Sequence, residues 1–145
     1  MSINVPPGTI SIWSDLGCPW AHLAVWRLHD VRRRLHLEDE VRFDHHVFPL
    51  ELFNSRPTPF SGLMAEIPVI GALAPRAGWQ VWQTDLTSWP GNLLLPMEAV
   101  QAAKEQSLHA SEELDRGLRR AFFGESRSIG MRHVILEVAS ECELV

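Results

Sequence analysis

Residues 13–24, Trp13-Ser14-Asp15-Leu16-Gly17-Cys18-Pro19-Trp20-Ala21-His22-Leu23-Ala24, hold the end of an apolar strand and the start of a helix. Residues 9–13 alternate and are rich in β-branched side chains, which predicts a strand. Residues 15–17 break that pattern, and Pro19 suits the first turn of a helix, where its missing N–H costs nothing. Cys18 is therefore predicted at or next to the helix N-cap. There, unpaired N–H groups and the positive end of the helix dipole favour a thiolate, so the sequence predicts a reactive sulfur.

The loop Cys18-Pro19-Trp20-Ala21 resembles the Cys-Pro-x-Cys active site of the DsbA-like thioredoxin-fold oxidoreductases, with alanine replacing the second cysteine. It also resembles the Ser-Pro-Tyr-type loop of kappa-class glutathione transferases and 2-hydroxychromene-2-carboxylate isomerases. In those enzymes the bound nucleophile is glutathione, and Cys18 would take the place of the serine. Further along, residues 47–50 are similar to the end of the family's second strand, and residues 118–129 to part of its inserted helical domain. The resemblance covers nearly the whole chain.

This resemblance implies an α/β fold, with a thioredoxin-like β-α-β unit and an inserted α-helical domain. Residues 1–60 would form the N-terminal half of the thioredoxin-like domain, and residues 61–145 the helical insertion. The closing β-hairpin and helix of that fold, with the cis-proline that faces the reactive cysteine, are missing from the sequence. We therefore expect a truncated fold with an exposed sheet edge next to Phe43 and Val47. Such a chain is expected to be poorly stable or to form homo-oligomers through that edge.

Three functions stay open for the chain. The first is a DsbA-like thiol-disulfide oxidoreductase that acts through Cys18 alone, because Ala21 cannot resolve a mixed disulfide. The second is a glutathione-dependent transferase or isomerase, in which Cys18 and the surrounding N–H groups hold a glutathione sulfur. The third is a non-enzymatic interaction protein or remnant. The resemblance favours the first, with a thiol or disulfide as substrate, glutathione as a candidate co-substrate and no permanently bound cofactor.

The neighbours of Cys18 complete the predicted site. His22 follows Cys18 by four residues on the first helical turn, where it would shield or activate the thiolate. The alternative is that His22 is a partly exposed helix residue without a role. Pro19, Trp20 and Ala21 are predicted to contact the substrate, with simple packing of Trp20 as the alternative.

The rest of the chain is predicted to be a helix, a second strand and a helical remainder. The helix covers residues 19 to about 36 and the strand residues 41–48, and two strands joined by a helix are expected to lie parallel. Trp13 and Phe43 are expected to be mainly buried. The later helices are predicted at residues 63–73, 97–107, 111–123 and 129–142, after a loop at residues 54–61.

Charged side chains on the predicted helices are assigned to solvent. Arg32-Arg33-Arg34 is interpreted as the wet side of the first helix. Two ion pairs, Asp115 with Arg119 and Glu112 with Arg116, are placed on outer helix faces.

Composition and charge exclude several classes of protein. The 145 residues are 46% hydrophobic and 21% charged, which allows one domain with a core. A net charge of −5 argues against nucleic acid as partner. The sequence has neither a signal-peptide pattern nor an apolar run of membrane length, so a cytoplasmic location without membrane contact is expected, in which Cys18 and Cys142 stay reduced. His45 and His46 point to opposite faces of a strand, so no metal site is expected.

Overall fold

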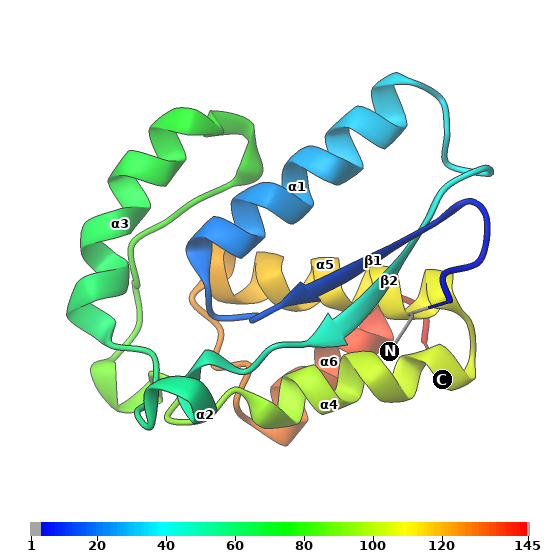
Figure 1. The fold of residues 1–145 in the computed structure, drawn as a ribbon. Helices are drawn as coiled ribbons and strands as arrows, with labels where there is room; N and C mark the ends of the chain where they lie inside the picture. The colour runs from blue at the N-terminus through cyan, green and yellow to red at the C-terminus, as the bar shows by residue number, and fades with distance from the viewer. Residues whose placement is uncertain (1–3, 145) are drawn as a thin grey trace.

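The N-terminal part of the chain forms a β-α-β unit in the computed structural model, which describes residues 4–144 (Figure 1). β1 (Thr9–Ser14) and β2 (Arg42–Val47) are connected by α1 (Pro19–Arg34). The two strands pair in parallel, with Thr9 opposite Arg42 and Ser14 opposite Val47. The predicted strands, the connecting helix and the parallel pairing are thus confirmed.

Helices make up the rest of the described chain. They follow in the order α2 (Leu50–Asn54), α3 (Phe60–Leu73), η1 (Pro75–Ala77), η2 (Leu86–Ser88), α4 (Leu94–Ala102), η3 (Ala103–Glu105), α5 (Leu108–Glu125) and α6 (Arg132–Glu141). The predicted later helices are confirmed as α3, α4 with η3, α5 and α6. Two features differ from the prediction: α2 is an additional helix, and α3 begins inside the predicted loop. Both helices begin directly after a proline, Pro49 or Pro59, whose extended backbone forms the N-cap.

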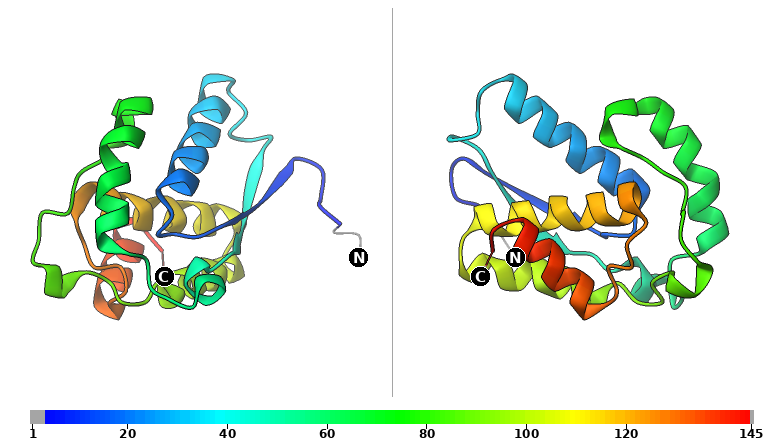
Figure 2. Two further views of the ribbon diagram at one scale, coloured as in Figure 1. Left: turned by 60° about the vertical axis from the view of Figure 1, so that its left-hand side comes forward. Right: turned by 180° about the vertical axis from the view of Figure 1, so that it is seen from behind.

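α5 is the central helix of the molecule. It lies against β2 and is flanked by α1 on one side and by α4 and α6 on the other (Figures 1 and 2). The main apolar cluster joins Leu16, which follows β1, to the inner faces of α4, α5 and α6. A smaller cluster of Leu23, Ile70 and Ala74 joins α1 to α3. No helix within residues 4–144 is long and apolar enough to cross a bilayer.

The outer edge of β2 is covered by side chains, so the predicted exposed edge next to Phe43 and Val47 is wrong. Glu112 of α5 accepts a hydrogen bond from the Phe43 N–H through Oε1 at 2.8 Å. Gln101 of α4 donates its Nε2 to the His45 carbonyl at 2.9 Å. Val47 packs against the main apolar cluster. The two helices thereby satisfy backbone groups that a third strand would otherwise bind.

One face of the two-stranded sheet is better covered than the other. Phe43 is 1% exposed, as predicted, whereas Trp13 is 48% exposed and the prediction of its burial is wrong. Trp13 stacks on its register neighbour His46 on the other face of the sheet, with ring centroids 4.5 Å apart. His45 is buried and His46 is partly exposed, as their opposite orientations require.

Arg32 does not face solvent, so the prediction that it lies on the wet side of α1 is wrong. Its side chain is buried and lies 2.7 Å from the Glu112 carboxylate, and it donates to the Val41 carbonyl at 2.9 Å. Arg33 and Arg34 are exposed as predicted. Because a buried guanidinium needs a buried partner, Arg32 fastens the end of α1 to α5 rather than facing water.

Candidate functional site

Cys18 is the N-cap residue of α1, as the sequence predicts. Its backbone is extended (φ −85°, ψ 115°), its side chain is partly exposed, and Pro19 follows in the first turn. The Cys18 carbonyl accepts the His22 N–H at 3.0 Å, which closes the first turn of the helix. The Cys18 side chain accepts no hydrogen bond from the helix. The sulfur therefore lies at the positive end of the α1 dipole without being used as a cap.

Asp15 holds the backbone of the loop that leads to Cys18. Its buried carboxylate accepts the Gly17 N–H at 2.6 Å and the Leu50 N–H at 2.7 Å. The Cys18 N–H in turn donates to the Asp15 carbonyl at 3.3 Å. Burial raises the pKa of Asp15, although both N–H groups and the charge of Arg119 oppose the rise. One side chain thus ties the end of β1 to the segment that follows β2.

Arg119 of α5, although far from Cys18 in the sequence, contacts the same loop. Its guanidinium donates to the Ser14 hydroxyl at 2.8 Å and to the Asp15 carbonyl at 3.3 Å. It also binds the Asp115 carboxylate at 2.8 Å, and both side chains are buried. The predicted pair of Asp115 and Arg119 exists, but its placement on an outer face is wrong. Arg119 is buried because it serves three partners in the protein interior.

The charge of Asp115 is maintained in this buried setting. Burial alone raises the pKa of its carboxyl. Arg119, together with His45 and His29, has the larger opposite effect, so the pKa of Asp115 lies below its usual range. His45 Nδ1 lies 3.7 Å from the carboxylate. Asp115 is therefore an anion that anchors Arg119 beneath the loop carrying Cys18.

His22 is buried, at 6% exposure, rather than partly exposed. Its ring stacks on Phe123 of α5, with centroids 4.8 Å apart, and contacts the edge of Trp79 at 4.5 Å. Burial, aided by the charge of Arg119, lowers the pKa of His22 to about 3, so the ring is neutral at pH 7. Neither ring nitrogen has a hydrogen-bond partner among the described residues. His22 thus faces α5, one helical turn beyond Cys18.

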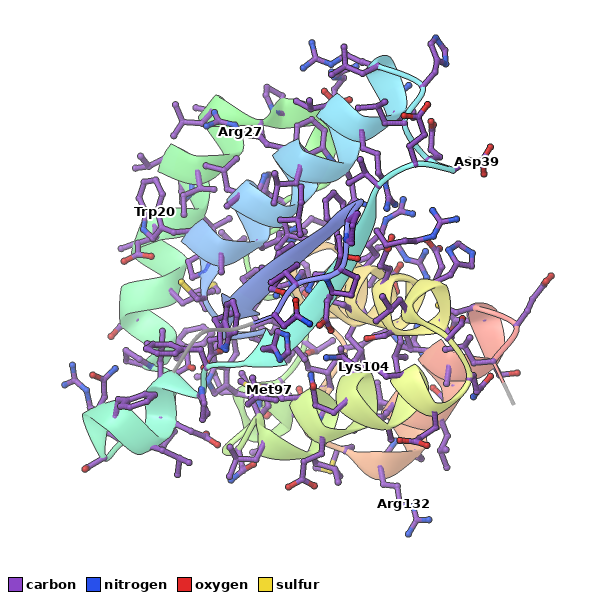
Figure 3. The ribbon with its side chains drawn as sticks, turned by 45° about the vertical axis from the view of Figure 1, so that its right-hand side comes forward. Trp20, Arg27, Asp39, Met97, Lys104 and Arg132 are labelled. Atoms are coloured by element: carbon purple, nitrogen blue, oxygen red, sulfur yellow. The ribbon has the colours of Figure 1, made fainter. Side chains whose placement is uncertain are left out.

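The three residues after Cys18 differ in exposure. Pro19 is buried, Trp20 is exposed and Ala21 is partly exposed. Figure 3 shows Trp20 standing out from the first turn of α1. Trp20 therefore offers an exposed aromatic surface on the first turn of α1, while Ala21 brings no second thiol to the loop.

The other thiol of the chain lies elsewhere. Cys142 follows α6, its Sγ is 3.5 Å from the Glu113 carbonyl, and both cysteines are free. Burial raises the pKa of the Cys142 thiol. Among residues 4–144, no group of three or more His, Cys, Asp or Glu side chains is placed to hold a metal ion.

Sequence reasoning missed the role of the buried charges on α5. Glu112, Asp115 and Arg119 recur at intervals of three and four residues, which places them on one side of a helix. This row lies one position away from the apolar stripe that includes Leu114 and Leu118. A charged row directly beside an apolar stripe is the signal that these residues border the core.

Comparison with known proteins adds no relative. No family model matches the chain, and no curated protein matches it. The motif and the geometry around Cys18 are therefore the basis for a functional assignment.

Proposed function

We propose that the chain is a DsbA-like thiol-disulfide oxidoreductase with a thioredoxin-like fold, acting through Cys18 as its single nucleophile. The observation that carries this proposal is the position of Cys18, a partly exposed N-cap residue at the junction of β1 and α1. Helix N-termini stabilise thiolates, and thiolates are the attacking species in disulfide exchange. The parallel β-α-β unit around this junction agrees with a thioredoxin-like arrangement.

The reaction is a pair of exchange steps. The Cys18 thiolate attacks one sulfur of a substrate disulfide, a bond forms between the two sulfurs, and the other substrate sulfur leaves as a thiolate. Because Ala21 has no thiol, a second thiolate from solution, such as glutathione, attacks the mixed disulfide and releases Cys18. The result is one disulfide exchanged for another, with Cys18 returned to its starting state. No net oxidation of the protein occurs in the cycle.

The surroundings of Cys18 have distinct supporting roles in this proposal. Asp15 and Arg119 fix the loop backbone, which keeps the sulfur at the helix end. Trp20 supplies an exposed aromatic surface against which a substrate chain or glutathione would lie. His22, buried against Phe123, orders the first turn of α1.

The test is reaction with oxidised glutathione followed by intact-mass measurement. Wild-type protein and a Cys142→Ser variant should gain one glutathionyl group rapidly, and added reduced glutathione should remove it. A Cys18→Ser variant, which keeps the Cys142 thiol, should react far more slowly, because Cys142 is partly buried with a raised pKa.

Two outcomes would reject the proposal. Equal reaction rates at Cys18 and Cys142 would mean that the helix end does not activate the sulfur. Saturable binding of reduced glutathione in calorimetry, without any mixed disulfide on Cys18, would instead indicate the glutathione-dependent transferase or isomerase type of site.

A further inference from the structure

A cavity of about 550 Å³ lies between α1 and α5. Its lining comes from the α5-facing side of α1, from η1 and from Glu113 to Arg120 of α5, and Cys142 closes it near α6. The view from behind in Figure 2 shows α1 and α5 on the two sides of this region, with α6 beyond α5. The volume is within the range of about 300–1,000 Å³ that is typical for small-molecule sites. Cys18 is not among the lining residues.

Two histidines of α1 supply hydrogen-bonding groups without partners. Both ring nitrogens of His22 and the Nε2 of His29 are buried and unpaired within the described residues. Burial is the main cause that lowers the pKa of each ring to about 3, so each ring is neutral. His22 keeps one donor and one acceptor, whereas His29 Nδ1 accepts from Arg32 Nη2 at 3.3 Å, which leaves its Nε2–H as a donor. Buried polar atoms are rarely left unpaired in proteins. These nitrogens are therefore available to a molecule in the cavity.

The walls of the cavity are rich in arginine. Six arginines and three carboxylates line it, in a chain whose net charge is −5. The arginines are Arg32, Arg33, Arg76, Arg116, Arg119 and Arg120. Two of them, Arg32 and Arg119, are occupied by the buried partners Glu112 and Asp115. Arginine side chains are thus concentrated around this cavity, each of them paired with a carboxylate.

The other four arginines form the rim and are free to change partners. Each of these side chains is more than half exposed, although each pairs with a neighbouring carboxylate, as Arg116 does with Glu113 at 2.8 Å. Arg76 lies 3.7 Å from Asp30, a long contact for an ion pair. Such solvent-exposed pairs contribute little free energy. A guanidinium binds carboxylate or phosphate oxygens through two parallel hydrogen bonds, so a ligand would compete well for it.

We infer that this cavity is a binding site for a small-molecule oxyanion, a carboxylate or a phosphate. Its charged group lies against the rim arginines, among them Arg76 and Arg116. Its polar body reaches the ring nitrogens of His22 and His29. The site is separate from Cys18, so it is tested without reference to thiol chemistry.

The test is a titration of the full chain, labelled with ¹⁵N at histidine, with inorganic phosphate and separately with citrate. Sodium chloride keeps the ionic strength constant, so that screening does not change during the titration. The ring signals of His22 and His29 should shift and saturate with at least one anion. Saturation by phosphate alone or by citrate alone identifies which oxyanion the site takes.

The matched variants separate the cavity from general surface charge. A double variant, Arg76→Gln with Arg116→Gln, should weaken binding roughly tenfold, because two charged hydrogen-bond donors are lost. Arg132→Gln should leave binding unchanged, because Arg132 begins α6, does not line the cavity and points away from the molecule in Figure 3. All three residues are exposed, so these variants are expected to fold.

The inference is overturned if neither anion produces saturable shifts of the two ring signals. It is also overturned if the double variant binds as tightly as the wild type, or if Arg132→Gln weakens binding as much as the double variant does. Urea unfolding of each variant shows whether weaker binding reflects a lost contact or a lost fold. Binding that weakens only in a folded double variant supports the site.

Discussion

α5 carries two kinds of charged contact. On its buried side, Asp115 and Arg119 are closed off from water and bind each other and the segment around Asp15. On its exposed side, Arg116 and Arg120 pair with carboxylates that water also reaches. The same residue type on one helix therefore acts as a structural link where water is excluded, and as an adaptable surface group where it is not.

The buried side connects every element of the β-α-β unit. Glu112 binds the edge of β2 through the Phe43 N–H and the end of α1 through Arg32. Arg119 binds the end of β1 and the loop before Cys18. Both ends of α1 are thus positioned by one helix. The side-chain contacts of α5 thus help to fix the small sheet.

The largest effect is expected from breaking the buried side with Arg119→Met. The carboxylate of Asp115 would stay buried without its guanidinium, which should lower the free energy of unfolding by about 3–5 kcal/mol. Urea unfolding followed by circular dichroism measures this loss. In Arg116→Met, the matched change on the exposed side, the loss should stay within about 1 kcal/mol.

Two results would contradict this comparison. Equal losses in Arg119→Met and Arg116→Met would mean that burial does not distinguish the two sides of α5. A double variant, Arg119→Met with Asp115→Leu, should be more stable than Arg119→Met alone, because the unpaired charge is gone. A double variant that is less stable than Arg119→Met would show that packing, rather than charge, accounts for the loss.

The elements of this fold follow from local sequence signals. Alternation predicts β1 and β2, and the breaker at Gly17 followed by Pro19 places Cys18 at the N-cap. These signals act within a few residues, so no knowledge of the rest of the molecule is needed. For the same reason the position of the thiol is the part of the candidate site that could be predicted.

Burial of charge could not be predicted in this way. Arg32 is buried because Glu112 of α5 lies opposite it in space, and Arg119 is buried because Ser14 and the Asp15 carbonyl lie opposite it. Likewise, alternation marks β1 as a strand without showing which face is covered, and Trp13 is on the open face. The α1–α5 cavity has the same origin, since its histidines and arginines come from segments far apart in the sequence. These features depend on tertiary partners that a single-sequence pattern does not specify.

The second prediction tests the difference between buried and exposed groups through the pH dependence of the free energy of unfolding. His22 and His29 have pKa values of about 3 in the folded protein, against 6.5 for a free ring. As pH falls below about 6.5, the unfolded chain therefore binds protons that the folded protein does not, so stability is full above this pH and decreases below it. Each ring should contribute a slope that approaches about 1.4 kcal/mol per pH unit once the pH is well below 6.5.

Urea unfolding between pH 6.5 and pH 5 checks this slope. The variant His22→Gln should lose roughly 1 kcal/mol per pH unit of it over this range, because one of the buried rings with a lowered pKa is removed, while His29 and His45 remain. His133→Gln is the matched control, since His133 is exposed on α6, and it should keep the wild-type slope. An unchanged slope in His22→Gln would mean that His22 takes up its proton in the folded state.

The smallest expected effect tests whether the loop next to Arg119 is also held by packing. Gly17 is buried, and a Cβ at this position would overlap Leu93 Cδ1 and lie 3.1 Å from Thr58 Oγ1. Gly17→Ala should therefore lower the free energy of unfolding by about 1–3 kcal/mol, as overpacking of a core does. Gly91→Ala, where no atom lies within 4 Å of the new Cβ, should change it by no more than about 0.5 kcal/mol. If urea unfolding gave the same stability for both variants, the loop could move away from Leu93, and Arg119 rather than packing would be what holds Cys18 in place.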